Sequence, residues 1–167
     1  MIGIKKINSL DKSEFLSIFG NVFEKSKWIS EKVFDKKPFK NLEFFVSEII
    51  GIYENSDNKT ILEILNLHPE LAVEKKLTTD SEVEQSKANL KQCTPEEFDE
   101  FKKLNIEYKK KFNFPFIIAV KGKNKNEILN NFRKRISSDI KTEFEEAVKQ
   151  VKKIASLRLL EIKNKNI

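Results

Sequence analysis

The chain has 167 residues, which predicts about one domain of ordinary size. Hydrophobic residues make up 39% and charged residues 35%, with only four glycines and four prolines, so collagen-like, linker-like and disordered classes are excluded. One cysteine and one histidine exclude an internal disulfide and metal sites built from several such ligands. We therefore expect a single core-forming domain over residues 1–167.

The charge balance is basic but evenly mixed. Lys and Arg number 32 and Asp and Glu number 26, which gives a formal net charge of +6. A basic balance can indicate a nucleic-acid or acidic membrane partner, or only a lysine-rich solvated surface. Because acids and bases alternate without long blocks of one sign, the composition favours the solvated surface, with neither nucleic acid nor membrane as a partner.

No targeting signal is predicted. The charges at Lys5 and Lys6 are not followed by the apolar stretch of a secretory signal, and no run approaches the roughly 18 apolar residues of a membrane span. The expected location is the cytoplasm.

Helix-start signals recur along the chain. In a capping box, a cap side chain and an acid three residues later bond each other's backbone amides. Three pairs fit this pattern: Asp11 with Glu14, Thr79 with Glu82, and Thr94 with Glu97. Pro95, directly after Thr94, suits a first helical position.

Hydrophobic periodicity predicts where the helices run. Apolar residues repeat at helical spacing in three long stripes. The stripes comprise Val46, Ile49, Ile50 and Tyr53; Phe98, Phe101, Tyr108 and Phe112; and Ile140, Phe144, Ala147, Val148, Val151, Ile154 and Ala155. The predicted helices are 11–24, 30–36, 40–55, 58–66, 80–91, 95–112, 124–136 and 138–164.

Strand signals are almost absent, since the chain has no Asn-Gly or Asp-Gly hairpin and no sustained polar–apolar alternation. Residues 113–120 contain Pro115 and a short apolar run, which predicts a buried extended stretch between helices. The fourteen phenylalanines are typical of a helical core. The expected fold is an all-α, irregular bundle of about eight helices.

Arg158 is a charge at a position where an apolar residue belongs. It follows Val151 and Ile154 on the stripe of the last helix. A guanidinium that faces a core must meet a carboxylate, a cluster of carbonyls or an anionic ligand. The alternative is an arginine at the rim of the stripe with its charge in water.

A polar face follows the Thr79 signal. Ser81, Glu84, Gln85 and Ala88 share one side of the predicted helix. Such a face could bind a ligand rich in hydrogen-bonding groups, or it could be solvated surface.

His68 precedes Pro69, which favours extended backbone at a helix boundary. A histidine can act as general acid or base near neutral pH, but many histidines only cap a helix or fill a core, and the local sequence does not decide. Cys93 lies in a loop without a visible activating base and is interpreted as structural.

Four ordered segments together resemble the family of 2-oxo-4-hydroxy-4-carboxy-5-ureidoimidazoline (OHCU) decarboxylases. The segments are LHPELA at 67–72, LTTDSEVEQ at 77–85, LN followed by Tyr108 and KFNFPFII at 104–118, and IASLRL at 154–159. Each segment alone is weak evidence for the family, but the four segments in this order are specific for it.

The resemblance implies an all-α homodimer, without metal or organic cofactor, that converts the small molecule OHCU to (S)-allantoin and carbon dioxide. The catalytic residues that it implies are His68, Glu84 and Arg158. The substrate-binding residues that it implies are Pro69, Ser81, Glu82, Val83, Glu84, Gln85, Phe116, Ile117, Ile118, Ala119, Val120 and Arg158.

Three features depart from the family pattern. The loop after Ala72 is shorter than usual, and Asn89 and Asn113 replace glycines. Asparagine tolerates left-handed backbone best among the other residues, which makes Asn113 acceptable. Two alternatives to the decarboxylase stay open: a basic helical binding module, and an inactive dimeric scaffold of the same family.

Overall fold

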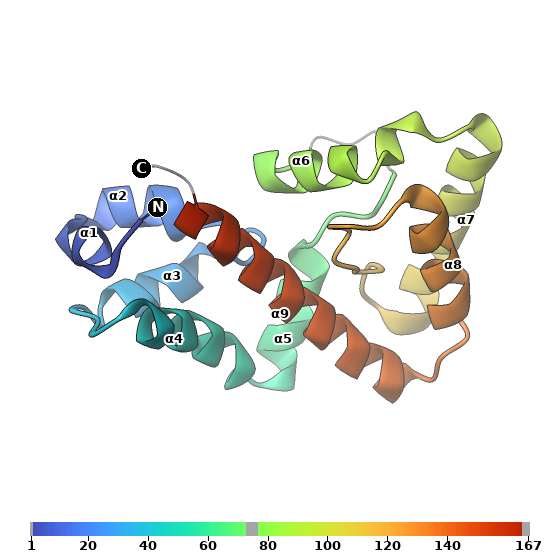
Figure 1. Ribbon diagram of the computed structural model, residues 1–167. Helices are drawn as coiled ribbons and strands as arrows, with labels where there is room; N and C mark the ends of the chain where they lie inside the picture. Colours follow the sequence, from blue (N-terminus) through green and yellow to red (C-terminus); the bar gives the residue numbers. More distant parts are fainter. Residues whose placement is uncertain (1, 73–76, 165–167) are drawn as a thin grey trace. The chain divides into compact units, whose positions relative to one another are not determined.

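α-Helices form the regular structure of the computed structural model, which describes residues 2–72 and 77–164 (Figure 1). Those residues contain nine α-helices and one 3₁₀ helix and no β-strand. The all-α prediction is therefore confirmed. The helices are α1 (Ile4–Ser9), α2 (Lys12–Phe19), α3 (Lys27–Phe34), α4 (Leu42–Glu54), α5 (Asn58–Leu67), α6 (Thr79–Lys87), the 3₁₀ helix η1 (Leu90–Gln92), α7 (Pro95–Phe112), α8 (Lys125–Arg135) and α9 (Ile140–Asn164).

The chain divides into two compact units. The first unit comprises Met1–Leu67 and Lys152–Ile167, and the second comprises His68–Val151. Helix α9 contributes its first half to the second unit and its second half to the first. The single domain over residues 1–167 stays a prediction.

Two of the three predicted capping boxes are confirmed. The side chains of Asp11 and Thr94 begin α2 and α7 with both reciprocal hydrogen bonds in place. The prediction at Thr79 is wrong by one residue, because the cap of α6 is Thr78, whose hydroxyl accepts from the amide of Ser81. Neighbouring threonines offer the same hydroxyl, so the sequence alone did not distinguish them.

Two predicted helices are shorter in the structure. The helix expected over 11–24 ends at Phe19, and the helix expected over 80–91 ends at Lys87. Asn89 then adopts left-handed backbone with φ 59°, and Asn113 ends α7 in the same conformation with φ 63°. Asparagine thus occupies two of the left-handed positions, as expected for Asn113. Helix α1, six residues without a side-chain cap, was not predicted.

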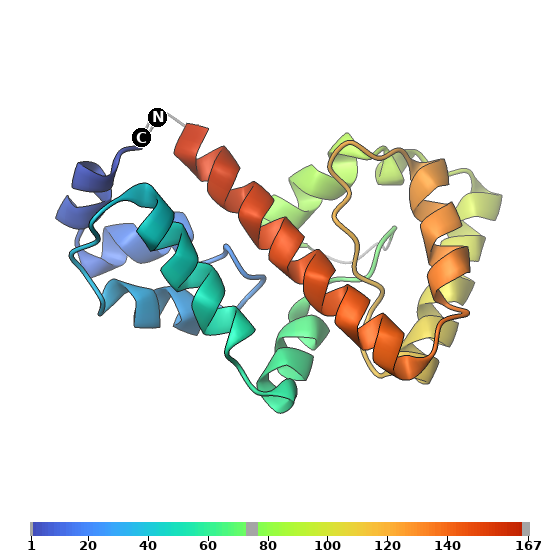
Figure 2. The same ribbon diagram turned by 60° about the horizontal axis from the view of Figure 1, so that its bottom comes forward.

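Phenylalanines form the core of the first unit. Phe19 lies 4.9 Å from both Phe15 and Phe45, measured between ring centroids, and all three side chains are almost fully buried. These rings join α2 to α4, while α3 packs against both helices (Figure 2). The predicted stripe on α4 is confirmed except at Val46, which is 37% exposed.

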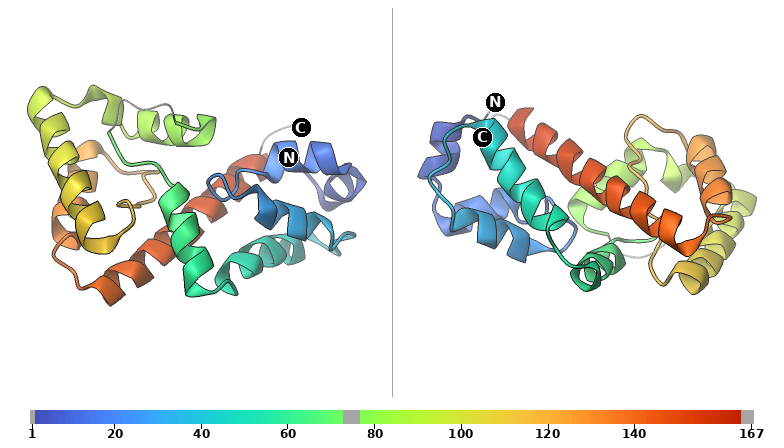
Figure 3. Two further views of the ribbon diagram at one scale, coloured as in Figure 1. Left: turned by 180° about the vertical axis from the view of Figure 1, so that it is seen from behind. Right: turned by 90° about the horizontal axis from the view of Figure 1, so that it is seen from below.

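The second unit packs around the segment 113–120, which we call the strap (Figure 3). The strap has no regular secondary structure, and all of its residues after Asn113 are buried, as predicted. The ring of Phe116 stacks on Phe132 of α8 at 3.9 Å. The stripe predicted on α9 is wrong at Ile140, which is 63% exposed. The inward side chain of that first turn is Glu143.

Candidate active site

Most of the predicted site residues belong to the second unit. His68, Pro69, the residues of α6 and the strap lie there, whereas Arg158 lies in the first unit. The two groups are therefore described in turn.

His68 directly follows the last residue of α5. Because a residue before proline is disfavoured in helical backbone, the helix ends where the pair His68–Pro69 begins. The imidazole is 8% exposed, and Pro69 is half-buried. We call residues 68–72 the His–Pro loop. A buried histidine at the start of a loop can serve as an acid or base if a ligand reaches it.

The polar face of α6 is buried, so its interpretation as solvated surface is wrong. Ser81 is 4% exposed, Gln85 is 6% exposed and Ala88 is 2% exposed. Glu84 on the same face is half-buried. A hydroxyl, an amide and a partly sheltered carboxylate therefore lie on one inward side of a nine-residue helix.

Glu82 and Val83 occupy the outer side of α6. Val83 is 43% exposed, and the carboxylate of Glu82 accepts from the ammonium of Lys91 at 2.7 Å. This hydrogen bond, together with the charge of Lys91, lowers the pKa of Glu82. Any contact of these two residues with a substrate would have to use their backbone.

Gln85 bonds the His–Pro loop with both ends of its amide. Its Oε1 accepts from the backbone amide of Ala72 at 3.2 Å, and its Nε2 donates to the carbonyl of Glu70 at 3.3 Å. Helix α6 is therefore tied to the segment that follows His68. Substrate binding by Gln85 stays a prediction.

The backbone of the strap is held by side chains of α8 and α9. The carbonyl of Ile117 accepts from Nη1 of Arg135 at 2.8 Å, and the amide of Ala119 donates to Oε1 of Gln150 at 2.9 Å. Two polar groups in the segment predicted to contact substrate are thus satisfied by the protein itself. These bonds fix the path of the buried strap.

A buried ionic cluster, which the local sequence patterns did not predict, supports the strap. Nη2 of Arg135 lies 2.5 Å from Oε1 of Glu143, whose carboxylate also accepts from the hydroxyl of Tyr108. The guanidinium lies 4.5 Å from the ring centroid of Phe116. Burial, and then the bond to Glu143, raises the pKa of Tyr108 well above its usual range.

A signal for this cluster exists in the sequence. Arg135 follows Ile128 by seven residues and Phe132 by three, so it continues the apolar stripe of α8. The same reasoning singled out Arg158. The pattern does not single out Arg135, because basic residues are common in the last turn of a helix.

Arg158 lies in the first unit with a carboxylate and a carbonyl as partners. Its Nη2 is 2.9 Å from Oε2 of Glu24, and its Nη1 donates to the carbonyl of Asn21 at 2.9 Å. The Arg158 side chain is 5% exposed and that of Glu24 is 0% exposed. The rim interpretation is therefore wrong, and a buried charge pair is present, as a core-facing guanidinium requires.

A pocket of about 510 Å³ lies beside the His–Pro loop in the second unit. Its lining includes Ala72, Gln85, Cys93 and Phe98. The shortened loop at 73–76 lies outside the described residues. Burial raises the pKa of the Cys93 thiol, which disfavours the reactive thiolate. Its structural or incidental role stays a prediction.

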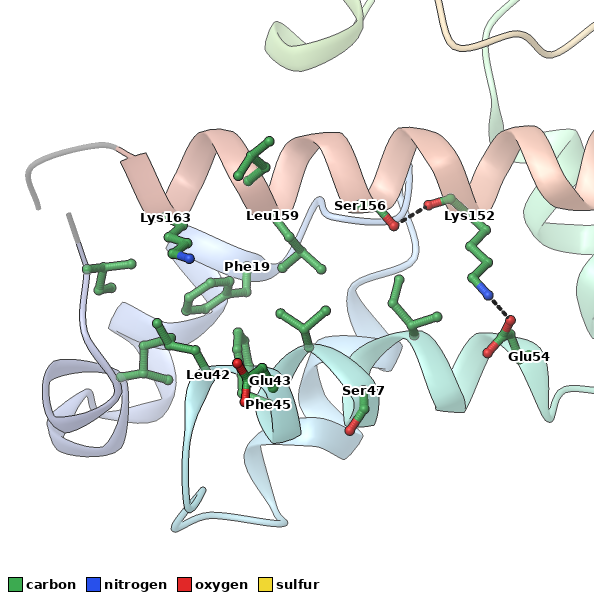
Figure 4. A pocket seen from close by; sticks show the side chains of 15 residues that line it. Phe19, Leu42, Glu43, Phe45, Ser47, Glu54, Lys152, Ser156, Leu159 and Lys163 are labelled. Carbon is green, nitrogen blue, oxygen red and sulfur yellow. Dashed lines mark hydrogen bonds and ion pairs between the residues drawn. The ribbon is translucent and has the colours of Figure 1, made fainter.

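The first unit has a second pocket, of about 620 Å³, between α4 and α9 (Figure 4). Its described lining is largely apolar and includes Phe19, Phe45 and Leu159, and the ion pair of Lys152 and Glu54 lies at one end. None of the predicted site residues is among these lining residues.

The described residues offer no metal-binding cluster. Residues 2–72 and 77–164 hold no group of three His, Cys, Asp or Glu side chains placed to share an ion. In the same residues, no helix has both the length and the hydropathy to cross a membrane.

Comparison with known proteins supplies the family. The family model described as OHCU decarboxylase matches residues 8–160. The chain therefore belongs to the OHCU decarboxylase family, as its resemblance in sequence had indicated.

Two relatives and one solved structure illustrate the similarity. The chain is 36% identical over 162 residues to the "Uric acid degradation bifunctional protein" of Bacillus sp. (strain TB-90), covering 97% of this chain and 32% of that protein. It is 32% identical to the "2-oxo-4-hydroxy-4-carboxy-5-ureidoimidazoline decarboxylase" of Haloferax volcanii, covering 95% and 94%. It also resembles the crystal structure of an OHCU decarboxylase in the presence of (S)-allantoin, with a TM-score of 0.69, 26% identity, and coverage of 86% and 95%. The chain thus spans about a third of the bifunctional relative and nearly all of the Haloferax volcanii protein.

Proposed function

We propose that this chain is a decarboxylase that converts OHCU to (S)-allantoin and carbon dioxide in urate degradation. The observation that carries the proposal is the family match over residues 8–160 in a chain that retains a buried histidine followed by proline. The similarity to an OHCU decarboxylase solved with (S)-allantoin supports it. The inward polar face of α6 supplies groups of the kind that a ureide would need.

The chemistry explains what the protein must supply. When the bond from C4 to the carboxylate breaks, carbon dioxide leaves and an electron pair stays on the ring. The neighbouring carbonyl and the imine-type ring can delocalise this pair, so the reaction does not require an organic cofactor or a metal. A proton must then reach C5, the carbon that bears the ureido group, from one face to give a single enantiomer. The hydroxyl on C4 gives up its proton and becomes the carbonyl of allantoin.

The proposed acid and base is His68, with Glu84 as its partner. A general acid or base positioned at the reacting atom contributes about 10²- to 10⁴-fold to the rate. A carboxylate beside the imidazole would favour the charged form, which can donate a proton to C5. The half-buried position of Glu84 on the inward face of α6 supports this pairing.

The remaining roles concern binding. Arg158 would hold an anionic or carbonyl oxygen of the substrate through guanidinium N–H groups, while Glu24 balances its charge. Ser81 and Gln85 would face the ureido and ring edges, Pro69 would pack beside them, and backbone groups of residues 82–83 and 116–120 would complete the contacts.

The enzyme would act on a small molecule, as a homodimer in the cytoplasm. The homodimer follows from the family resemblance, and its test is the mass of the protein in solution by light scattering. A monomer at working concentration would contradict it.

The test of the function is stereochemical. OHCU prepared immediately before use is added to the enzyme, and optical activity is followed against spontaneous decay, which gives racemic allantoin. The wild-type chain should produce optically active allantoin, and His68→Asn should lose about 10²- to 10⁴-fold in rate. Asn66→Ala, an exposed change in α5 two residues before His68, is the control.

The outcomes separate the alternatives. A wild-type protein that is folded and dimeric but gives only racemic product would be an inactive scaffold. A protein that instead binds nucleic acid with strongly salt-dependent affinity would be a basic binding module. Full activity in His68→Asn would remove His68 from the mechanism.

A further inference from the structure

The backbone directly after His68–Pro69 is held in a strained conformation. Ala72 has φ +51°, in the left-handed region that residues with a side chain rarely adopt. Ala72 is nevertheless buried within the second unit. Such strain persists only where surrounding contacts enforce it, and it is concentrated at functional sites.

Two buried amides from different helices enforce this conformation. Gln85 of α6 bonds the carbonyl of Glu70 and the amide of Ala72, as described above. Asn105 of α7 donates through Nδ2 to the carbonyl of Leu71 between them, at 3.0 Å. Three consecutive residues of the His–Pro loop are therefore fixed by side chains from outside the loop.

Helix α7 makes one more contact with the His–Pro loop, through Lys109. Lys109, one turn after Asn105, places its ammonium 3.7 Å from the carboxylate of Glu70. This pair is partly exposed and contributes little by itself. Its position shows that one face of α7 is directed along the His–Pro loop.

Asn105 is an unfavourable choice for stability alone. The residue is 4% exposed, and its Oδ1 is buried without a hydrogen-bond partner among the described residues. A buried acceptor without a donor costs free energy, which leucine of similar shape would avoid. What the Asn105 side chain does contribute is the hydrogen bond from Nδ2 to the carbonyl of Leu71.

We propose that Asn105 is a positioning residue for His68: it holds the carbonyl of Leu71, and so fixes the loop that sets the position of the imidazole. This inference rests on the proposed function. Asn105 acts through the loop and not on the substrate. A small displacement of a catalytic group, of about 1 Å, can cost about 10²-fold in rate.

The test uses Asn105→Leu, which removes the donor and the orphaned acceptor at nearly constant shape. We expect kcat to fall by about 10²-fold while KM changes little, because the loop positions a reacting group. Because His68 is the only histidine, its ring signals are unambiguous in NMR spectra, and they should shift in the variant. The backbone amide of Ala72 should exchange with solvent faster.

Ser30→Ala is the matched control. It deletes a buried side-chain bond, from the Ser30 hydroxyl to the carbonyl of Phe19, in the first unit. This change should lower the melting temperature but leave kcat and the His68 signals unchanged. If Asn105→Leu fails to fold, Asn105→Ser, which removes the amide with less bulk, takes its place.

The results distinguish this inference from the proposed function. Wild-type protein without decarboxylase activity would overturn the function, while a shift of the His68 signals in the variant would still support positioning. Active wild type with unchanged kcat and unchanged His68 signals in Asn105→Leu would overturn the inference alone. A loss of kcat that merely follows the fraction of unfolded protein would also overturn it.

Discussion

Each of the two units buries one arginine–glutamate pair, and the two pairs are built alike. In the first unit, Arg158 lies between the carboxylate of Glu24 and the carbonyl of Asn21. In the second unit, Arg135 lies between the carboxylate of Glu143 and the carbonyl of Ile117. In both, a planar guanidinium connects a buried acid to a stretch of irregular backbone. Its fixed fork of donors suits this task better than the single ammonium of lysine.

The pair in the second unit lies among aromatic side chains. The carboxylate of Glu143 also accepts from Tyr108, and Arg135 lies over the ring of Phe116. Arg158 is in addition a predicted catalytic and substrate-binding residue, a role that was not predicted for Arg135. The comparison therefore separates a purely supporting ionic cluster from one with a proposed role in binding.

The largest effect is expected from Arg135→Met. This change leaves the carboxylate of Glu143 buried without its cation, which should lower the free energy of unfolding by about 3–5 kcal/mol, measured in urea. Arg133→Met is the control, since Arg133 lies on the same helix and bonds Glu100 at the surface. The free energy of unfolding should fall much less in Arg133→Met than in Arg135→Met. Equal losses of unfolding free energy in the two variants would contradict the claim that burial makes the Arg135–Glu143 pair the more important one.

The next effect concerns Arg158→Lys. The ammonium keeps the charge opposite Glu24 but cannot reproduce the fork, so we expect turnover of OHCU to fall by about 10²-fold. Circular dichroism should show that the variant is folded. Unchanged turnover would make Arg158 a structural partner of Glu24, and the two pairs would then have the same purpose.

The smallest effect concerns pH. Burial raises the pKa of both Tyr108 and Tyr53, one in each unit, above the usual value of about 10. Because the folded pKa is the higher one, the neutral tyrosines stabilise the fold below about pH 10, and this stabilisation is lost as the pH rises through the folded pKa. The free energy of unfolding should therefore fall above about pH 10.

Tyrosine variants test this assignment. Tyr108→Phe should cost about 1–3 kcal/mol at pH 7, because Glu143 loses a donor, and should make the alkaline fall shallower. Tyr53→Phe should also make the fall shallower without disturbing Glu143. Alkaline slopes that match wild type in both variants would contradict the assignment.

Local sequence signals predicted helix limits well where capping residues and proline specify the ends of the helix. The predicted limits of α7, 95–112, are those observed, because Thr94, Glu97 and Pro95 specify its start and Asn113 its end. The errors have physical causes. Helix α1 carries no side-chain cap, and the first turn of α9 turns Glu143 inward and Ile140 outward because Glu143 finds Arg135 in α8.

The candidate site was predicted as a set of residue types and not as a set of contacts. Pattern alone placed Arg158 on an apolar stripe, with burial against a partner as one of two alternatives. It also placed Ser81, Glu84, Gln85 and Ala88 on one face. It did not reveal that Gln85 bonds the His–Pro loop, or that Asn105 does the same from α7. Those partners lie 13 to 34 residues apart in the sequence.

The amino-acid sequence by itself determined that this protein is all-α, where most of its helices begin, and that its strap is buried, because caps, proline and apolar spacing act over a few residues. The tertiary structure alone decided which acid each buried arginine meets and which backbone each buried amide holds. A buried polar group must find a partner wherever the fold brings one within about 3 Å, and no local pattern encodes that distance.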